Sequence, residues 1–128
     1  MNILNVTIIP CLSDNYTYLI HDKYNNKVIA VDPPVVEPIT TFLNKSNLNL
    51  DFILSTHHLE LTKIYDCEII GFEEDSNRIP GIDIKLKNHE TWKFGSETVK
   101  IEHAPGHTSG HVFYHFQKNK LAFVGDIV

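Results

Sequence analysis

The sequence predicts a single domain of the α/β (α+β) class, in which helices cover one face of a sheet. Short runs of alternating apolar residues, the pattern of half-buried strands, recur along the whole chain. Apolar residues recur at helical spacing in only two segments, residues 35–43 and 59–65. The chain has 128 residues, the length of one domain, and no linker or internal repeat divides it. We therefore expect residues 1–128 to form one unit.

The first third of the chain predicts a meander of antiparallel strands. Residues 2–9 and 16–22 both alternate as half-buried strands, and Pro10–Asp14 separates them. The asparagines at 25–26 tolerate a positive φ and predict a hairpin turn. The apolar run at residues 28–31 then forms the third strand.

A helix and a crossover follow the meander. Asp32-Pro33-Pro34 stops the third strand, and the helical pattern begins at Val35. Residues 44–50 are polar and predict a return loop. Residues 52–56 form a buried strand, which we expect to be parallel to an earlier strand because a helical crossover precedes it.

The second half of the chain predicts a short helix and further strands. The helix lies at residues 59–65 and is followed by a strand at residues 68–71 and a charged loop. Residues 82–86 alternate with a lysine facing water, as the edge strand of a sheet does. The remaining strands form two hairpins, residues 90–94 with 98–103 and residues 112–116 with 121–124.

Composition excludes several classes of protein. The net charge is -5, so the chain lacks the basic surface that nucleic acid requires. No apolar run is long enough to span a membrane, and the first residues do not open a signal peptide. Cys11 and Cys67 lie far apart, and without a sign of export we expect two reduced thiols. We expect a cytoplasmic protein.

Histidine and aspartate residues follow three of the predicted strands. Thr56-His57-His58 closes an apolar run, and so does Gly125-Asp126 near the end of the chain. His103-Ala-Pro-Gly-His-Thr-Ser-Gly-His111 places three histidines within nine residues between two strands. Imidazole and carboxylate suit zinc, iron or manganese. Because strand ends can meet at one edge of a sheet, these residues predict a metal site there.

Taken in order, these motifs resemble the metallo-β-lactamase superfamily. The matching motifs are Val31-Asp32-Pro33, Ser55-Thr56-His57-His58, Ala104-Pro-Gly-His-Thr-Ser-Gly-His111 and Val124-Gly125-Asp126. Two further features, Asp14-Asn15-Tyr16 and the Thr-Ser-Gly-His after Pro105-Gly106-His107, point more closely to glyoxalase II (hydroxyacylglutathione hydrolase). The resemblance covers essentially all 128 residues. It implies that the chain is the N-terminal half of an αββα sandwich.

The resemblance also implies a reaction and a set of metal ligands. In that family, two metal ions at the edge of the sandwich acidify water and polarise a thioester carbonyl, so that an S-hydroxyacylglutathione is hydrolysed. His57 matches the first histidine of the family's metal-binding motif, and His107 matches the histidine of its Pro-Gly-His-Thr turn. Asp126 matches the bridging aspartate. The resemblance identifies no catalytic or cofactor-binding residue other than these three metal ligands.

The metal-binding motif departs from the family pattern, Thr-His-x-His-x-Asp-His. After His58 the chain continues with Leu59-Glu60-Leu61-Thr62-Lys63. If this sequence is aligned with the family pattern without a gap, Leu59, Leu61 and Thr62 replace the second histidine, the aspartate and the last histidine. Alternatively, a short segment between His58 and Leu59 is deleted. Either alignment leaves no Asp-His pair after His57. We therefore expect the motif to be disrupted.

The second departure lies at the end of the chain. The family's second half supplies partner strands, a further metal-binding histidine and the helices that hold glutathione, and the sequence stops at Val128. We therefore expect an incomplete, truncated domain. His57, His107 and Asp126 can hold one zinc ion with an open position, but not a pair of ions. His58, His103 or His111 could substitute for a missing ligand.

Three functions remain open from the sequence. The chain is an active glyoxalase II-like hydrolase, a non-catalytic remnant, or a binding module that keeps one metal ion. We favour a thioester hydrolase by descent that is impaired or inactive in this form, so whether the chain is an enzyme stays open. Half a sandwich leaves an apolar sheet face uncovered, so we expect the chain to self-associate as a homo-oligomer, to bind a partner, or to be poorly stable.

Overall fold

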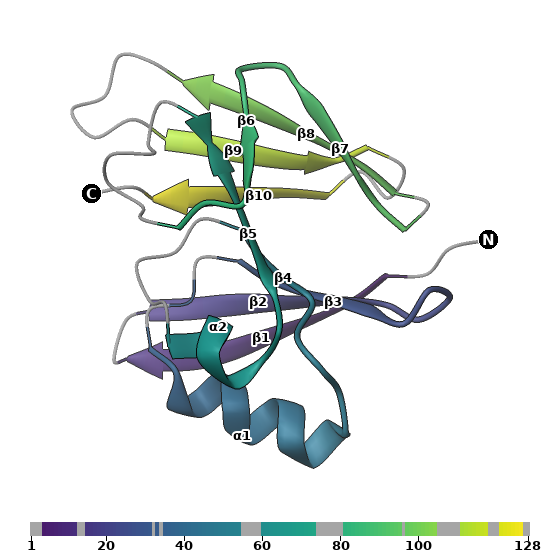
Figure 1. Ribbon diagram of the computed structural model, residues 1–128, viewed down its shortest axis with the longest axis vertical. Coiled ribbons are helices and arrows are strands. Elements are labelled where there is room, and N and C mark those ends of the chain that lie inside the picture. The colour runs from purple at the N-terminus through teal and green to yellow at the C-terminus, as the bar shows by residue number, and fades with distance from the viewer. Residues whose placement is uncertain are drawn as a thin grey trace.

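Two facing β-sheets, with helices against one of them, make up the structure, a computed structural model (Figure 1). The described residues are 4–12, 15–31, 33, 35–54, 60–73, 81–95, 97–104, 111–117 and 121–126. For residues 12, 15, 60, 103–104, 111–113 and 121–126, only the backbone is described. The predicted α/β (α+β) class, a meander followed by two helices and further strands, is confirmed.

The larger sheet contains six strands in chain order. They are β1 (Leu4–Leu12), β2 (Asn15–Asp22), β3 (Lys27–Val31), β4 (Phe52–Leu54), β5 (Glu68–Phe72) and β6 (Ile84–Leu86). The first three pair antiparallel, whereas β3 to β6 pair parallel. The predicted meander, the parallel crossover into β4 and the edge position of β6 are therefore confirmed.

The first strand does not stop where the sequence suggested. β1 continues through Pro10 to Leu12, with a shift in register between these two residues. Proline lacks a backbone N–H, so a central strand rarely accepts it, but an edge strand does. β1 is an edge strand of the larger sheet, which explains the difference.

The two helices follow the predicted pattern, with one difference in length. α1 (Glu37–Ser46) includes three residues of the predicted return loop, and α2 (Glu60–Ile64) matches the second helical segment. Asn47 caps the C-terminus of α1, with a φ of 55° in the left-handed region that asparagine tolerates. No helix in the described ranges could cross a bilayer, since α1, the longer of the two, has 10 residues.

The smaller sheet is formed by both predicted hairpins. Its strands are β7 (Thr91–Phe94), β8 (Glu97–Ala104), β9 (His111–Phe116) and β10 (Leu121–Asp126), in the spatial order β10-β9-β8-β7. All neighbours are antiparallel. Phe94 pairs with Glu97, and Phe116 pairs with Leu121, so each turn lies where the sequence placed it.

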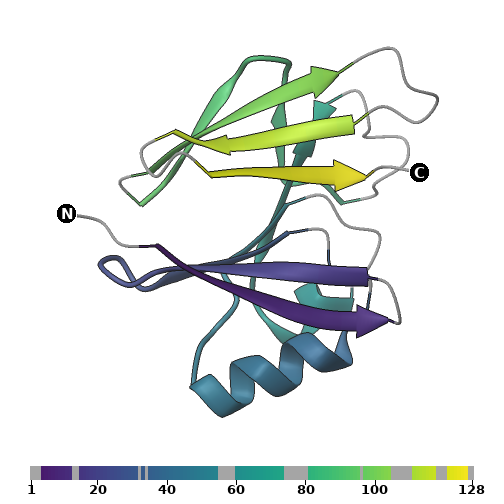
Figure 2. The ribbon, with the colours of Figure 1, turned by 180° about the vertical axis from the view of Figure 1, so that it is seen from behind.

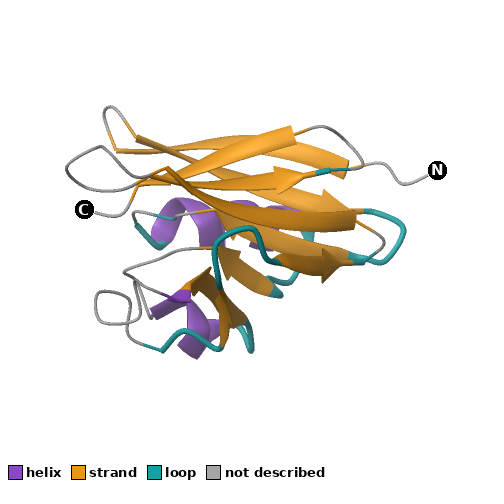
Figure 3. Ribbon diagram, turned by 90° about the horizontal axis from the view of Figure 1, so that it is seen from above, coloured by secondary structure: helices purple, strands orange, loops and turns teal. Residues whose placement is uncertain are grey.

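Apolar side chains fill two layers. The layer between the sheets contains Ile20, Ile29 and Leu54 from the larger sheet and Phe94 and Tyr114 from the smaller one. The second layer lies between the larger sheet and the helices. In Figure 3 the helices are purple and the strands are orange. The layers hold the strands whose ends form the candidate site.

Candidate functional site

Several strand ends lie along one side of the sandwich, at the left of Figure 1. β4 ends there, β8 ends at Ala104, β9 begins at His111 and β10 ends at Asp126. In the register of the smaller sheet, Ala104 and Asp126 both lie opposite His111. Facing residues of an antiparallel pair have Cα atoms about 4.5–5.5 Å apart. The backbones of these three residues are therefore neighbours.

Of the three predicted metal ligands, Asp126 has a described backbone, and it is the last residue of β10. His57 and His107 lie outside the described residues. The segment that contains His107 joins Ala104 to His111, two residues that are partners in the sheet. The assignment of the three residues as metal ligands therefore stays a prediction.

The structure distinguishes His111 from the other spare histidines of the chain. The register of β9 and β10 places the backbone of His111 directly opposite that of Asp126. From the histidine-rich segment alone, one cannot tell whether His103 or His111 lies beside Asp126. Counting back from the turn at residues 117–120 would have given this pairing, because each step away from a hairpin turn adds one facing pair.

A buried hydrogen bond fixes the strand ends of the larger sheet on the same side. Thr17 Oγ1 donates to the carbonyl oxygen of Val31 at 2.7 Å, and both residues are buried. Val31 is the last residue of β3 and lies beside Leu54, the last residue of β4. The bond therefore ties β2 to the end of β3, beside the point where the chain leaves β4.

Three polar side chains also meet on the face of the smaller sheet that points away from the larger sheet. Glu102 approaches Lys100 Nζ at 3.9 Å and His115 Nε2 at 3.8 Å. These half-exposed pairs contribute little to stability. In the parts of the chain that are described, no three histidine, cysteine, aspartate or glutamate side chains form a group that could hold a metal ion.

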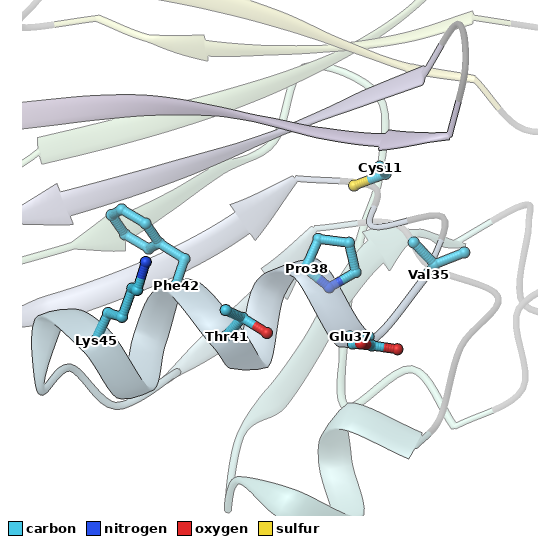
Figure 4. A pocket seen from close by; sticks show the side chains of 7 residues that line it. All are labelled: Cys11, Val35, Glu37, Pro38, Thr41, Phe42 and Lys45. Carbon is cyan, nitrogen blue, oxygen red and sulfur yellow. The ribbon is translucent and has the colours of Figure 1, made fainter.

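A pocket of about 570 Å³ lies between α1 and the end of β1 (Figure 4). It is lined by Cys11, Val35, Glu37, Pro38, Thr41, Phe42 and Lys45. Burial raises the pKa of the Cys11 thiol above its ordinary value, although a hydrogen bond with the backbone of Thr17 opposes the shift. The thiol is therefore largely protonated near neutral pH and is a weak nucleophile.

The two cysteines, both free as predicted, should differ in reactivity. Burial raises the pKa of Cys67 to about 11, so at about pH 8 its thiolate fraction is about a hundredfold smaller than that of a free thiol. We expect iodoacetamide to alkylate Cys11 well before Cys67 in the native protein, and both at similar rates in urea. Peptide mass spectrometry over time measures the two rates. Equal native rates would contradict the burial of Cys67.

The family model described as "Metallo-beta-lactamase superfamily" matches residues 18–128. The chain belongs to the metallo-β-lactamase superfamily. The predicted family is therefore confirmed, and the match includes all the strand ends of the candidate site. It begins within β2, so the first strand lies outside the matched range.

Among its relatives in this superfamily are proteins named hydroxyacylglutathione hydrolase. The one from Pelagibacter ubique is 38% identical over 131 residues, which cover 96% of this chain and 55% of the relative. The one from Methylococcus capsulatus is 39% identical and covers 96% of this chain and 51% of its own length. The predicted resemblance to glyoxalase II is thus confirmed, while the chain spans about half the length of these curated relatives.

Several solved structures share the fold of this chain. The B3 metallo-β-lactamase BLEG-1 superposes with a TM-score of 0.73 at 20% identity, covering 93% of this chain and 70% of that one. ETHE1 from Myxococcus xanthus gives a TM-score of 0.67 at 19% identity, covering 88% of this chain and 52% of that one. The di-zinc B3 enzyme LRA-12, from an Alaskan soil metagenome, gives 0.67 at 18%, with 94% and 58% covered.

Proposed function

We propose that this chain descends from hydroxyacylglutathione hydrolases, which are metal-dependent thioester hydrolases, and that this hydrolytic activity is impaired or absent in the chain. Relatives of that name are 38% and 39% identical to nearly the whole chain. The observation that carries the proposal is the strand-end edge, where the backbones of Ala104, His111 and Asp126 are neighbours. In this proposal the edge is the ancestral active site.

The donor set proposed for this edge is two imidazoles and one carboxylate, from His57, His107 and Asp126. Three such ligands with one open position suit a single zinc ion. When bound, zinc polarises a carbonyl and acidifies water, the chemistry that thioester hydrolysis needs. A second ion would need further ligands, and no Asp-His pair follows His57 in the sequence. We therefore propose at most one zinc ion per chain.

In this proposal the chain's own residues hold and orient the metal ligands. Fully buried Tyr114 and Phe116 anchor β9, whose first residue lies opposite Asp126. The hydrogen bond from Thr17 to Val31 ties β2 to the end of β3, which pairs with β4, the strand that precedes His57 in the sequence. The thioester of an S-hydroxyacylglutathione is the proposed ancestral substrate. A second candidate, a module that binds one ion without turnover, is favoured by the same count of three ligands.

Zinc analysis of two matched histidine variants tests the ligand set. After dialysis we expect at most one zinc ion per chain, and His107→Asn should lower zinc affinity at least about tenfold, since even changes behind a metal ligand have that effect. His89→Asn is the control, because His89 is exposed with a φ of 70° that asparagine tolerates. Unchanged zinc binding in His107→Asn would contradict the assignment.

An assay with an S-hydroxyacylglutathione thioester and added zinc tests the activity. We expect little or no turnover, and no difference between the parent chain and His107→Asn. Two zinc ions per chain, together with turnover that His107→Asn abolishes and His89→Asn preserves, would instead establish an active dinuclear hydrolase. One ion without turnover would favour the binding module.

A further inference from the structure

The pocket between α1 and the end of β1 has a polar side and an apolar side. Glu37, Thr41 and Lys45 form a row along α1, because residues four apart in a helix lie on one face. Figure 4 shows them in this order along the helix. The apolar side consists of the remaining lining residues, Cys11, Val35, Pro38 and Phe42.

The pocket lies on the helix side of the larger sheet. Cys11 and Phe42 both pack against the apolar layer between that sheet and the helices. In Figure 2, α1 (blue) lies below β1 (dark purple), whereas the smaller sheet (green to yellow) lies above it. The pocket is therefore separate from the layer between the two sheets.

The polar row makes no contact that a ligand would have to break within the described part of the chain. There, neither Glu37 nor Lys45 forms an ion pair, and the hydroxyl of Thr41 forms no hydrogen bond. All three residues are exposed. A carboxylate, a hydroxyl and an ammonium group are thus open to a ligand along one wall of the pocket.

The two charges of the row lie at opposite ends of the pocket. Glu37 belongs to the first turn of α1 and Lys45 to the last. The helix dipole adds about half a charge of the opposite sign at each end, which is less than the full charge of either side chain. One end of the pocket therefore stays negative and the other positive. A ligand with a single charge would match only one end, whereas a zwitterion matches both.

The distance between the charges sets the length of the ligand. Lys45 follows Glu37 by eight positions, which is about 12 Å along a helix. An extended peptide spans about 3.3–3.6 Å per residue, so three or four residues cover this distance. The volume of about 570 Å³ also lies in the usual range of small-ligand sites, about 300–1,000 Å³.

We propose that this pocket binds a peptide of three or four residues that has free termini and an apolar middle. Its ammonium group would contact Glu37, and its carboxylate would contact Lys45. The hydroxyl of Thr41, halfway along the row, would bond to the peptide backbone. The apolar side chains of the peptide would cover Pro38 and Phe42, the apolar side of the pocket.

Two forms of one tripeptide test the role of the charges. Ala-Leu-Ala with free termini, titrated to about 5 mM, should shift the amide NMR signals of Thr41 and Phe42 to saturation. The same tripeptide, acetylated and amidated, keeps its side chains but loses both terminal charges. Its dissociation constant should be at least about threefold larger, because an exposed ion pair contributes up to about fivefold in affinity.

A matched pair of lysine variants tests the positive end. Lys45→Gln should raise the dissociation constant of the free tripeptide about two- to fivefold and leave that of the blocked tripeptide unchanged. Lys63→Gln is the control, because Lys63 is also an exposed lysine in the last turn of a helix, α2. It should bind both tripeptides as the parent chain does. Far-UV circular dichroism should show that both variants fold.

Alkylation of Cys11 gives a second readout of occupancy. Because Cys11 lines the pocket, the free tripeptide at about 5 mM should slow its reaction with iodoacetamide at least about threefold. Neither shift nor protection at that concentration would overturn the proposal. Equal affinities of the free and blocked tripeptides would overturn it in favour of a purely apolar groove. If a tripeptide acetylated at its N-terminus alone binds as tightly as the free one, the site takes organic anions instead.

Discussion

Replacing Phe94 with alanine is expected to lower the free energy of unfolding by about 3–5 kcal/mol, the scale for a fully buried aromatic ring. Phe94 has no exposed surface. Its ring makes T-shaped contacts with Phe52 and Phe116, at centroid distances of 6.2 Å and 6.3 Å, and it stacks on Trp92 at a centroid distance of 6.2 Å. Since Phe52 belongs to the larger sheet, the loss would weaken the contact between the sheets.

Urea unfolding followed by tryptophan fluorescence and circular dichroism measures this loss. The control is Tyr24→Ala, because Tyr24 is 80% exposed in the turn after β2 and should change stability by less than about 0.5 kcal/mol. The two probes should agree for the parent chain. A loss below about 1 kcal/mol for Phe94→Ala would mean that the layer between the sheets is not packed as described.

The layer around Phe94 also bears on the proposed metal site. In the sequence, His57 follows β4 of the larger sheet, and His107 lies between β8 and β9 of the smaller sheet, in which Asp126 ends β10. The distance between the proposed ligands therefore depends on how the two sheets pack. A variant that loosens this packing should bind zinc more weakly, and zinc should in turn stabilise the parent chain, because a ligand that binds only the folded state favours it.

Local patterns in the sequence were sufficient for most of the elements. Asn26 has the expected left-handed conformation, with a φ of 54°, and Gly95 forms the turn that closes β7 and β8. Turn residues and alternation act within a few positions, so the sequence displays them directly. The same holds for the helical spacing of α1 and α2.

Features that depend on distant contacts were not predictable. The extension of β1 past Pro10 depends on the edge position of that strand in the sheet. The sequence predicted an uncovered apolar sheet face but not its location. The described outer side chains of β8, Thr98, Lys100 and Glu102, are polar, whereas exposed apolar side chains lie beside β1. The expected self-association stays a prediction.

In the candidate site, too, local motifs were predictable from the sequence and distant contacts were not. The motifs that carry the family resemblance were visible in the sequence, and the family is confirmed. The neighbouring backbones of His111 and Asp126 follow from strand register, which the turn at residues 117–120 sets. The number of ions bound depends on the side chains of His57 and His107, which lie outside the described residues. For that reason the zinc measurement carries more weight than any further pattern in the sequence.

Replacing Gly95 with alanine is expected to lower the free energy of unfolding by about 2–4 kcal/mol, from a strained backbone and a broken hydrogen-bond network. Gly95 has a φ of 60°, and a Cβ atom there would overlap Asp22 Oδ2 and lie 2.5 Å from Asn25 Nδ2. These atoms are not free to move. Asp22 Oδ2 accepts from Asn25 Nδ2 at 2.8 Å, and Asp22 Oδ1 accepts from the Tyr24 N–H at 3.0 Å.

Two further variants separate the backbone strain from the overlap. Gly71→Ala is the matched control, because its Cβ would lie 3.0 Å from Ile82 Cδ1, the end of a flexible side chain, and should cost about 1 kcal/mol or less. Gly95→Asn relieves the backbone strain, since asparagine tolerates the left-handed region, but it keeps the Cβ. If overlap with the Asp22–Asn25 pair dominates, urea midpoints should place Gly95→Asn close to Gly95→Ala. Recovery of the parent midpoint by asparagine would show that the turn conformation alone requires glycine.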